Sequence, residues 1–224
     1  MNRLLPPLDH SATGGPSEVV FSDDPHVLGA IARCEVGLAV WQRPVPEDLG
    51  AWIDALPMSA LPNDRLLLRP HQAQQAVAGL LWAAHRGDQA MQERLAADVA
   101  QLVRVFADLA GQRLVDLRLQ GIEHDACWRF HYDHVPLRLI CNYRGPATQW
   151  VPPELREMAL AAQRDYDGPL RELPRFAAAL FKGALAPGQV GVVHRSPPIA
   201  GTGQTRLFLC LNEPSSVSPL PWQG

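Results

Sequence analysis

The chain has 224 residues, of which 47% are hydrophobic and 19% are charged, a composition typical of a folded protein long enough to bury a core. Its formal net charge of −3 provides no basic field, which argues against nucleic acid or an anionic membrane and favours a small-molecule or protein substrate. Prolines at positions 6 and 7 interrupt the N-terminal segment before a signal region develops, and no stretch approaches the roughly 20 apolar residues of a membrane span, so we expect a cytoplasmic protein.

The first half of the chain predicts an arm followed by helices. Residues 1–24 are rich in Pro, Gly, Ser and Asp and are expected to form a flexible N-terminal arm. Residues 25–111 are expected to be mainly helical, and the last helix has a continuous apolar face that a sheet or another helix must cover. The elements expected there are a helix at 25–33, strands at 36–41 and 65–69, a helix at 46–56 and two helices within 71–110.

After Gly111 the hydrophobic pattern changes from helical to alternating, which indicates the start of a sheet. Residues 112–224 are therefore expected to form a β-rich core that contains one helix, at 153–164. Strands are expected at 114–120, 128–133, 137–143, 148–151, 190–194 and 206–211. Short strands separated by Gly and Pro turns predict an antiparallel barrel or jelly roll.

A candidate metal site lies at the end of one of these strands. His131 and Asp133 are two residues apart, so in an extended chain their side chains project to the same face. His194, at the end of a second predicted strand, would complete a facial triad of two histidines and one carboxylate. The open positions of such a triad suit Fe(II) and oxygen chemistry. The alternative is a histidine that a neighbouring carboxylate holds at the rim of the barrel.

Three neighbouring side chains are further candidates for the same site. The four cysteines form no C-x-x-C pair and are expected to be reduced. Cys127 lies four residues before His131, and a thiolate ligand there would favour Zn over Fe. His124 and His134 flank the motif and are either additional ligands or exposed groups near the site.

The segments WRFHYDHVPLRLICNYRG and APGQVGVVHRSPPIAGTGQTRLFLCL resemble the double-stranded β-helix of the 2-oxoglutarate and Fe(II)-dependent oxygenases. The resemblance rests on H-x-D, a distal His and an Arg about a dozen residues later, and it covers residues 112–212. Most of the chain also resembles a bacterial family of unknown function with the phrases CxxFHxD, YRGPxTxW and HRSPPIxGTGxTR.

The oxygenase resemblance implies that His131, Asp133 and His194 bind Fe(II) and that Arg206 pairs with the distal carboxylate of 2-oxoglutarate. It also implies that Tyr143 or Asn142 supplies a further hydrogen bond to this cosubstrate. The short run before His194 and the insertion between Val151 and Leu173 depart from the commoner oxygenases.

The sequence thus predicts an α+β protein in which N-terminal helices pack against a double-stranded β-helix, or jelly roll, formed by residues 112–224. The expected function is a 2-oxoglutarate and Fe(II)-dependent dioxygenase, an oxidoreductase of the hydroxylase type. The alternative from another class is a non-redox Zn-binding jelly-roll protein of metal homeostasis, and a third hypothesis is an interaction module with a vestigial site.

Overall fold

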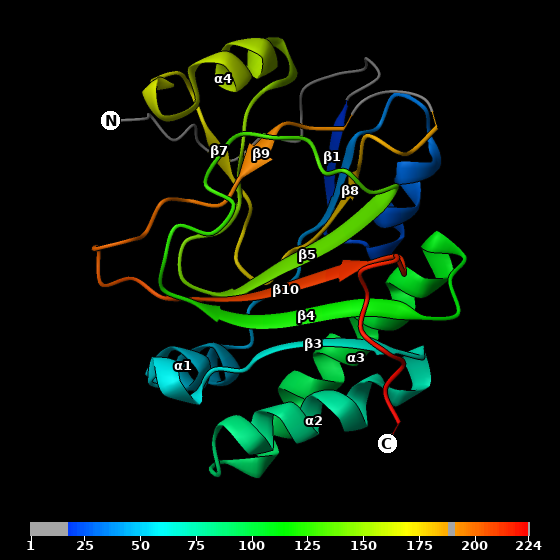
Figure 1. Cartoon of the computed structure of the whole chain (residues 1–224), viewed down its shortest axis with the longest axis vertical. Coiled ribbons are helices and arrows are strands. Elements are labelled where there is room, and N and C mark those ends of the chain that lie inside the picture. Colours follow the sequence, from blue (N-terminus) through cyan, green and yellow to red (C-terminus); the bar gives the residue numbers. More distant parts are fainter. Residues whose placement is uncertain (1–17, 188–190, 224) are drawn as a thin grey trace.

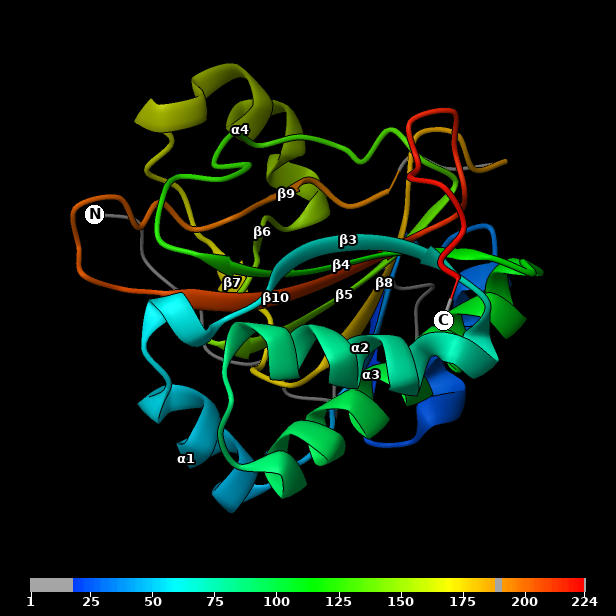
Figure 2. The same cartoon turned by 60° about the horizontal axis from the view of Figure 1, so that its bottom comes forward.

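Figure 1 shows the computed structural model of the chain, which describes residues 18–187 and 191–223. Two β-sheets face each other, and helices α2 and α3 cover the outer face of the larger sheet (Figures 1 and 2). The chain is therefore a mixed α+β protein built in layers. No helix within the described residues is both long enough and apolar enough to cross a membrane.

The larger sheet has seven strands in the order β1-β2-β8-β5-β10-β4-β3. Only β1 and β2 pair in parallel, and all the other neighbours are antiparallel. Its strands are β1 (Val19–Ser22), β2 (Leu38–Trp41), β3 (Asn63–Leu68), β4 (Val115–Ile122), β5 (Leu137–Arg144), β8 (Ala178–Lys182) and β10 (Arg206–Asn212). The smaller sheet has the order β7-β6-β9, with β6 (Gln149–Trp150), β7 (Arg171–Glu172) and β9 (His194–Arg195).

The helices form where the apolar spacing of the sequence is helical. They are α1 (Glu47–Ala55), α2 (Ala73–Ala84), α3 (Gln89–Ala110) and α4 (Arg156–Ala162), with short 3-10 helices at Pro25–Ala32, Met58–Ala60, Pro70–Gln72, Pro153–Leu155 and Gln163–Asp165. The Asp88 carboxylate accepts the Met91 N–H at the start of α3. Gly111, at φ +64°, ends α3 in the left-handed conformation that glycine adopts at low cost, so the chain turns directly into β4.

Three apolar clusters hold the layers together. The largest packs the apolar face of α3, with Leu95, Val99 and Phe106, against the helix-facing side of the large sheet, which includes Leu119 and Leu209. The second fills the space between the two sheets, where Ile140, Phe181 and Trp150 meet. The third packs α4 onto the small sheet. The inner face of the large sheet is thus covered by the small sheet, and the candidate site lies in this interior.

Several strands differ from the sequence expectation. Val19–Ser22, inside the predicted arm, pairs with β2, whereas residues 1–17 of that arm lie outside the described residues. The strand expected at 128–133 is a loop with a single bridge between His131 and His194. Strand β8 was not expected, because its residues are buried on both faces and show no alternation. The large sheet contains strands from both sides of residue 112.

Candidate metal centre

The backbone brings the three predicted ligands together. His131 and His194 form an antiparallel bridge in which each N–H donates to the carbonyl of the other residue at 3.1 Å. Their rings lie 4.7 Å apart between centroids. Asp133 follows two residues later, and one ligand atom from each of the three residues lies within 4.8 Å of the others. The structure therefore brings together His131, Asp133 and His194 as a group that can hold a metal ion.

The hydrogen bonds of both histidines present Nε2 as the ligand atom. The Nδ1 atom of His131 lies 2.8 Å from the Arg129 carbonyl oxygen, and that of His194 lies 2.9 Å from the Val192 carbonyl oxygen. A carbonyl only accepts, so each Nδ1 must carry a hydrogen, and the neutral ring then exposes a lone pair on Nε2. These Nε2 atoms lie 3.7 and 3.4 Å from the Asp133 carboxylate oxygens, near the spacing of about 3 Å between adjacent ligands of one ion.

The Asp133 carboxylate fits a cation because one of its oxygens has no donor. Its side chain is 1% exposed, and Oδ2 is buried without a hydrogen-bond partner among the described residues. Burying such an oxygen costs free energy unless a cation or a donor satisfies it. The other oxygen, Oδ1, accepts a hydrogen bond from Arg138, whose Nε donates to Asn212 at 2.7 Å. The residues present therefore fit a divalent metal with nitrogen and oxygen ligands.

The electrostatics keep the carboxylate charged. Burial alone would raise the pKa of Asp133, but His131, His194 and Arg138 outweigh burial and hold that pKa well below its ordinary range. Burial alone would lower the pKa of His131, but Asp133 and the Arg129 carbonyl raise it. A proton and a metal ion therefore compete for the same Nε2 atom.

The remaining ligand candidates lie outside this group. Cys127 lines the adjacent pocket, with its backbone at φ +48°, but it does not belong to the set of ligand atoms around Asp133. His124 and His134 are exposed and do not belong to the set either. The sequence left all three open, and the geometry favours a centre without a thiolate.

Arg206 lies in the interior between the sheets, but without a carboxylate partner. The side chain has no exposed surface, and no carboxylate among the described residues lies within ion-pair distance of it. Its Nε donates to the Pro146 carbonyl at 2.9 Å, and its Nη2 donates to Asn142 Oδ1 at 2.7 Å. Burial lowers the pKa of Arg206 to about 10. Gly145 allows this arrangement, because a Cβ there would lie 2.1 Å from the Thr205 carbonyl oxygen.

Asn142 and Tyr143, the two alternatives for a further hydrogen bond, lie on opposite faces of β5. Asn142 is buried beside Arg206, on the face between the sheets. The Tyr143 hydroxyl donates to Asp98 Oδ2 of α3 at 2.6 Å, on the helix-covered face. Successive residues of a strand point to opposite faces, so only one of the two side chains can reach the site, and that one is Asn142.

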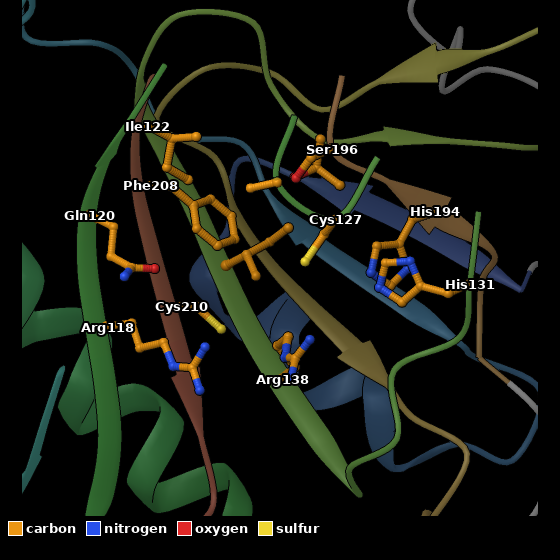
Figure 3. Close-up of a pocket in the computed structure, with 13 residues that line it drawn as sticks. Arg118, Gln120, Ile122, Cys127, His131, Arg138, His194, Ser196, Phe208 and Cys210 are labelled. Atoms are coloured by element: carbon orange, nitrogen blue, oxygen red, sulfur yellow. The ribbon is translucent and has the colours of Figure 1, made fainter. Parts of the chain in front are cut away.

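A cavity of about 110 Å³ adjoins His131, Asp133 and His194, which are called the metal group below (Figure 3). A single water needs about 10–15 Å³ by this measure, so the cavity has room for a small molecule. Two arginines that were not among the predicted site residues, Arg118 and Arg138, also line it. The sequence pattern that could have identified Arg118 is the row of polar residues at every second position of β4. The pattern was not sufficient, because the sequence alone does not show that another sheet covers this face.

A family model described as "Protein of unknown function (DUF1826)" matches residues 22–212. The chain belongs to this family. Membership confirms the resemblance to a family of unknown function that the motif phrases predicted. No curated protein matches the chain.

Two solved structures with low sequence identity are similar to this DUF1826 chain. One is a prolyl-4-hydroxylase from Pseudomonas putida, with 14% identity over 84% of this chain and 93% of that chain and a TM-score of 0.40. The other is an oxidoreductase of the 2OG-Fe(II) oxygenase family from Burkholderia pseudomallei, with 12% identity over 95% of both chains and a TM-score of 0.40.

Proposed function

We propose that this protein is a 2-oxoglutarate and Fe(II)-dependent oxygenase that hydroxylates a small-molecule or protein substrate. The observation that carries the proposal is the group of His131, Asp133 and His194. Backbone carbonyls direct both Nε2 atoms, and one carboxylate oxygen has no donor in the described part of the chain. Two histidines and one carboxylate leave open positions on a metal, and this ligand set suits Fe(II).

The proposal assigns a separate task to each part of the site. His131, Asp133 and His194 hold the ion, and Arg138 fixes the Asp133 carboxylate through Oδ1. When bound, Fe(II) and 2-oxoglutarate supply the oxidation: O2 is consumed, 2-oxoglutarate becomes succinate and CO2, and a substrate C–H becomes C–OH. The apolar lining of the pocket, which includes Ile122, Ile140 and Phe208, excludes water from the reacting atoms.

Arg206 binds the distal carboxylate of 2-oxoglutarate in this proposal. A planar guanidinium holds a carboxylate through two parallel hydrogen bonds, and a buried arginine without a carboxylate partner is costly unless a ligand provides one. Phe208 lines the pocket, and its ring centroid lies 5.3 Å from the guanidinium carbon of Arg206. Because Arg206 is fully covered, binding requires that the side chains over it, such as Phe208, move aside.

We infer that the large sheet and the small sheet are the two walls of a double-stranded β-helix, closed at one point by the bridge between His131 and His194. In that arrangement the metal group lies where the walls meet, and the cavity extends between them.

The metal assignment is tested by metal content after chelation and anaerobic reloading with Fe(II). Wild type is expected to bind one ion per chain, and His131→Ala is expected to lose it. His134→Ala is the matched control, because this exposed histidine lies three residues away and outside the ligand group. Equal metal occupancy in wild type and His131→Ala would show that this group does not bind the metal.

The cosubstrate assignment is tested by thermal unfolding of the Mn(II)-loaded protein. If 2-oxoglutarate at about 100 times its Kd stabilises the native state by about 2.7 kcal/mol, Tm rises by about 5–10 °C. Arg206→Gln should retain the metal and lose this rise. No rise in wild type at millimolar 2-oxoglutarate would contradict the oxygenase proposal, and tight Zn binding without this response would favour a non-redox metal-binding role.

A further inference from the structure

The cavity beside His131, Asp133 and His194 has one wall whose polar side chains have no task in the proposed reaction. Figure 3 shows the two histidines on one side of this pocket and Arg118, Gln120 and Ile122 of β4 on the opposite side. Phe208 and Cys210 of β10 line the floor between them. A molecule that fills the cavity therefore touches the β4 wall at one end and approaches the metal group at the other.

Arg118 lines this wall with its guanidinium group. The residue pairs with Cys210 in the register between β4 and β10, and strand alternation turns its side chain toward the pocket. Its Nε is buried and has no hydrogen-bond partner among the described residues. An unpartnered guanidinium nitrogen costs free energy in the free protein, and a ligand that accepts its hydrogen bonds would recover that cost.

The neighbouring charges do not neutralise Arg118. Arg138, the other arginine of the pocket, is paired with Asp133. Asp116, two residues before Arg118 on the same strand face, is held by Arg65 through two hydrogen bonds of 2.8 and 2.5 Å and by Ser218 at 2.5 Å. The Asp116 carboxylate also attracts Arg118, but its hydrogen bonds come from Arg65 and Ser218. Arg65 pairs with Arg118 in the register of β3 and β4, so two arginines share this one carboxylate and a positive charge remains at the β4 wall.

We propose that Arg118 binds the carboxylate of a small organic acid, which is the substrate, and so directs the apolar part of that acid toward the metal group. The inference rests on the proposed function and names its substrate class. The guanidinium fork matches a carboxylate, and Ile122, Ile140 and Phe208 provide apolar contacts for a short hydrocarbon chain.

Binding of isovalerate to the Mn(II)-loaded protein, saturated with 2-oxoglutarate, tests this assignment by calorimetry. Isovalerate carries one carboxylate on a short branched chain, and isovaleramide is its neutral counterpart. Wild type is expected to bind isovalerate at least about tenfold more tightly than isovaleramide, and Arg118→Gln is expected to weaken isovalerate binding by about tenfold or more. Arg104→Gln, which removes an exposed arginine from α3, is the matched control and should bind as wild type does.

A second measurement separates an anchor from a structural arginine. Because the Nε of Arg118 has no hydrogen-bond partner within 18–187 and 191–223, Arg118→Gln should leave the Tm of the ligand-free protein unchanged or raise it. A structural arginine would lower Tm when removed. The same variant should retain the metal and the full Tm rise with 2-oxoglutarate, which keeps this test separate from that of Arg206.

The outcomes are distinct from failure of the oxygenase proposal. No isovalerate binding to wild type up to about 10 mM, or unchanged binding in Arg118→Gln, would overturn the assignment. Loss of the 2-oxoglutarate response in Arg118→Gln would make Arg118 the cosubstrate anchor instead. Tighter binding of isobutyl phosphate than of isovalerate would show that the group bound by Arg118 is a phosphate and not a carboxylate.

If 2-oxoglutarate has no effect on any variant, the proposed function fails. Isovalerate binding without 2-oxoglutarate then still decides whether Arg118 is a carboxylate site.

Discussion

At the scale of single residues, the ligand group followed from the sequence, but its surroundings did not. His131 and Asp133 come together as predicted, although the segment that holds them is a loop and not the strand that motivated the prediction. His194 was expected to end a strand at 190–194, but it begins the short strand β9, and residue 190 lies outside the described residues. The tautomers depend on carbonyls of Arg129 and Val192, which only the folded loop positions. Arg138 donates to Asp133 only five residues before it, but its side chain is also held by Asn212, which lies 74 residues away. Contacts over such separations leave no local pattern.

The opposite directions of Asn142 and Tyr143 lead to a prediction about function and stability. Burial and the Asp98 carboxylate raise the pKa of Tyr143 well above its usual value, so the hydroxyl stays protonated and donates. Tyr143→Phe should cost about 1.5–3 kcal/mol of unfolding free energy, because it removes a hydrogen bond to a charged group. Denaturant unfolding measures this loss.

The same variant should retain metal and the Tm rise with 2-oxoglutarate, whereas Asn142→Ala should weaken that rise because Arg206 loses the Oδ1 atom that orients it. Equal loss of the 2-oxoglutarate response in both variants would show that the two faces of β5 are not functionally separate.

At the scale of elements, long periodic segments were predicted well and short buried ones were not. Helix α3 and strand β4 have clear apolar periods, so their positions could be predicted directly. Strand β8 is uniformly buried and rich in alanine, so it shows no period. The loop around His131 resembles a strand in composition. Strand pairing is interrupted by Cys127 at φ +48° and by the hydrogen bond from the His131 side chain to the Arg129 carbonyl within the same segment.

The C-terminal segment offers an element-scale prediction, because it is attached to the edge of the large sheet. Trp222 donates its backbone N–H to the Leu67 carbonyl at 2.7 Å, and Ser218 donates to Asp116 of β4. Burial alone would raise the pKa of Asp116, but hydrogen bonds from Arg65 and Ser218 outweigh burial and lower it. Asp116→Asn should therefore reduce the free energy of unfolding at pH 7 by about 2 kcal/mol.

The sign of the pH dependence follows from the lowered pKa. The stabilisation by the Asp116 carboxylate is fully present above the ordinary Asp value of about 3.9 and is lost as the pH falls below it. The difference between wild type and Asp116→Asn should thus shrink below about pH 4 in denaturant titrations. Asp64→Asn, at an exposed position on β3, is the control and should show little effect at any pH. A difference that is constant with pH would exclude this ionic contribution.

At the scale of the whole molecule, the metal group connects parts that the layers otherwise hold only by packing. His131 and Asp133 belong to the connection between β4 and β5 of the large sheet, whereas His194 belongs to the small sheet. The apolar cluster between the sheets lies next to this point, and Phe181 of that cluster packs 4.4 Å from the His194 ring, measured between centroids. An ion bound there would therefore join the two sheets across the interior, beyond what either sheet's own hydrogen bonds provide.

This connection predicts that metal stabilises the fold in a pH-dependent way. Mn(II) or Zn(II) should raise Tm by several degrees in wild type and not in His194→Ala, because a ligand that binds only the native state stabilises it by mass action. Asp133 and the Arg129 carbonyl raise the pKa of His131 despite its burial, so a proton stabilises the metal-free fold at low pH. That contribution is fully present below the ordinary His value of about 6.5 and is lost as the pH rises through the raised value.

Stabilisation by the metal depends on pH in the opposite way to stabilisation by the proton, since the ion requires both imidazoles in their neutral form. The metal-induced rise in Tm should accordingly be large near about pH 8 and decline toward about pH 5.5, and scanning calorimetry with and without chelator measures it directly. His71→Ala, an exposed position far from the group in sequence, should behave as wild type does. A rise of equal size at both pH values, or one that persists in His194→Ala, would mean that the stabilising ion binds elsewhere and that the two sheets are held together by their apolar contacts alone.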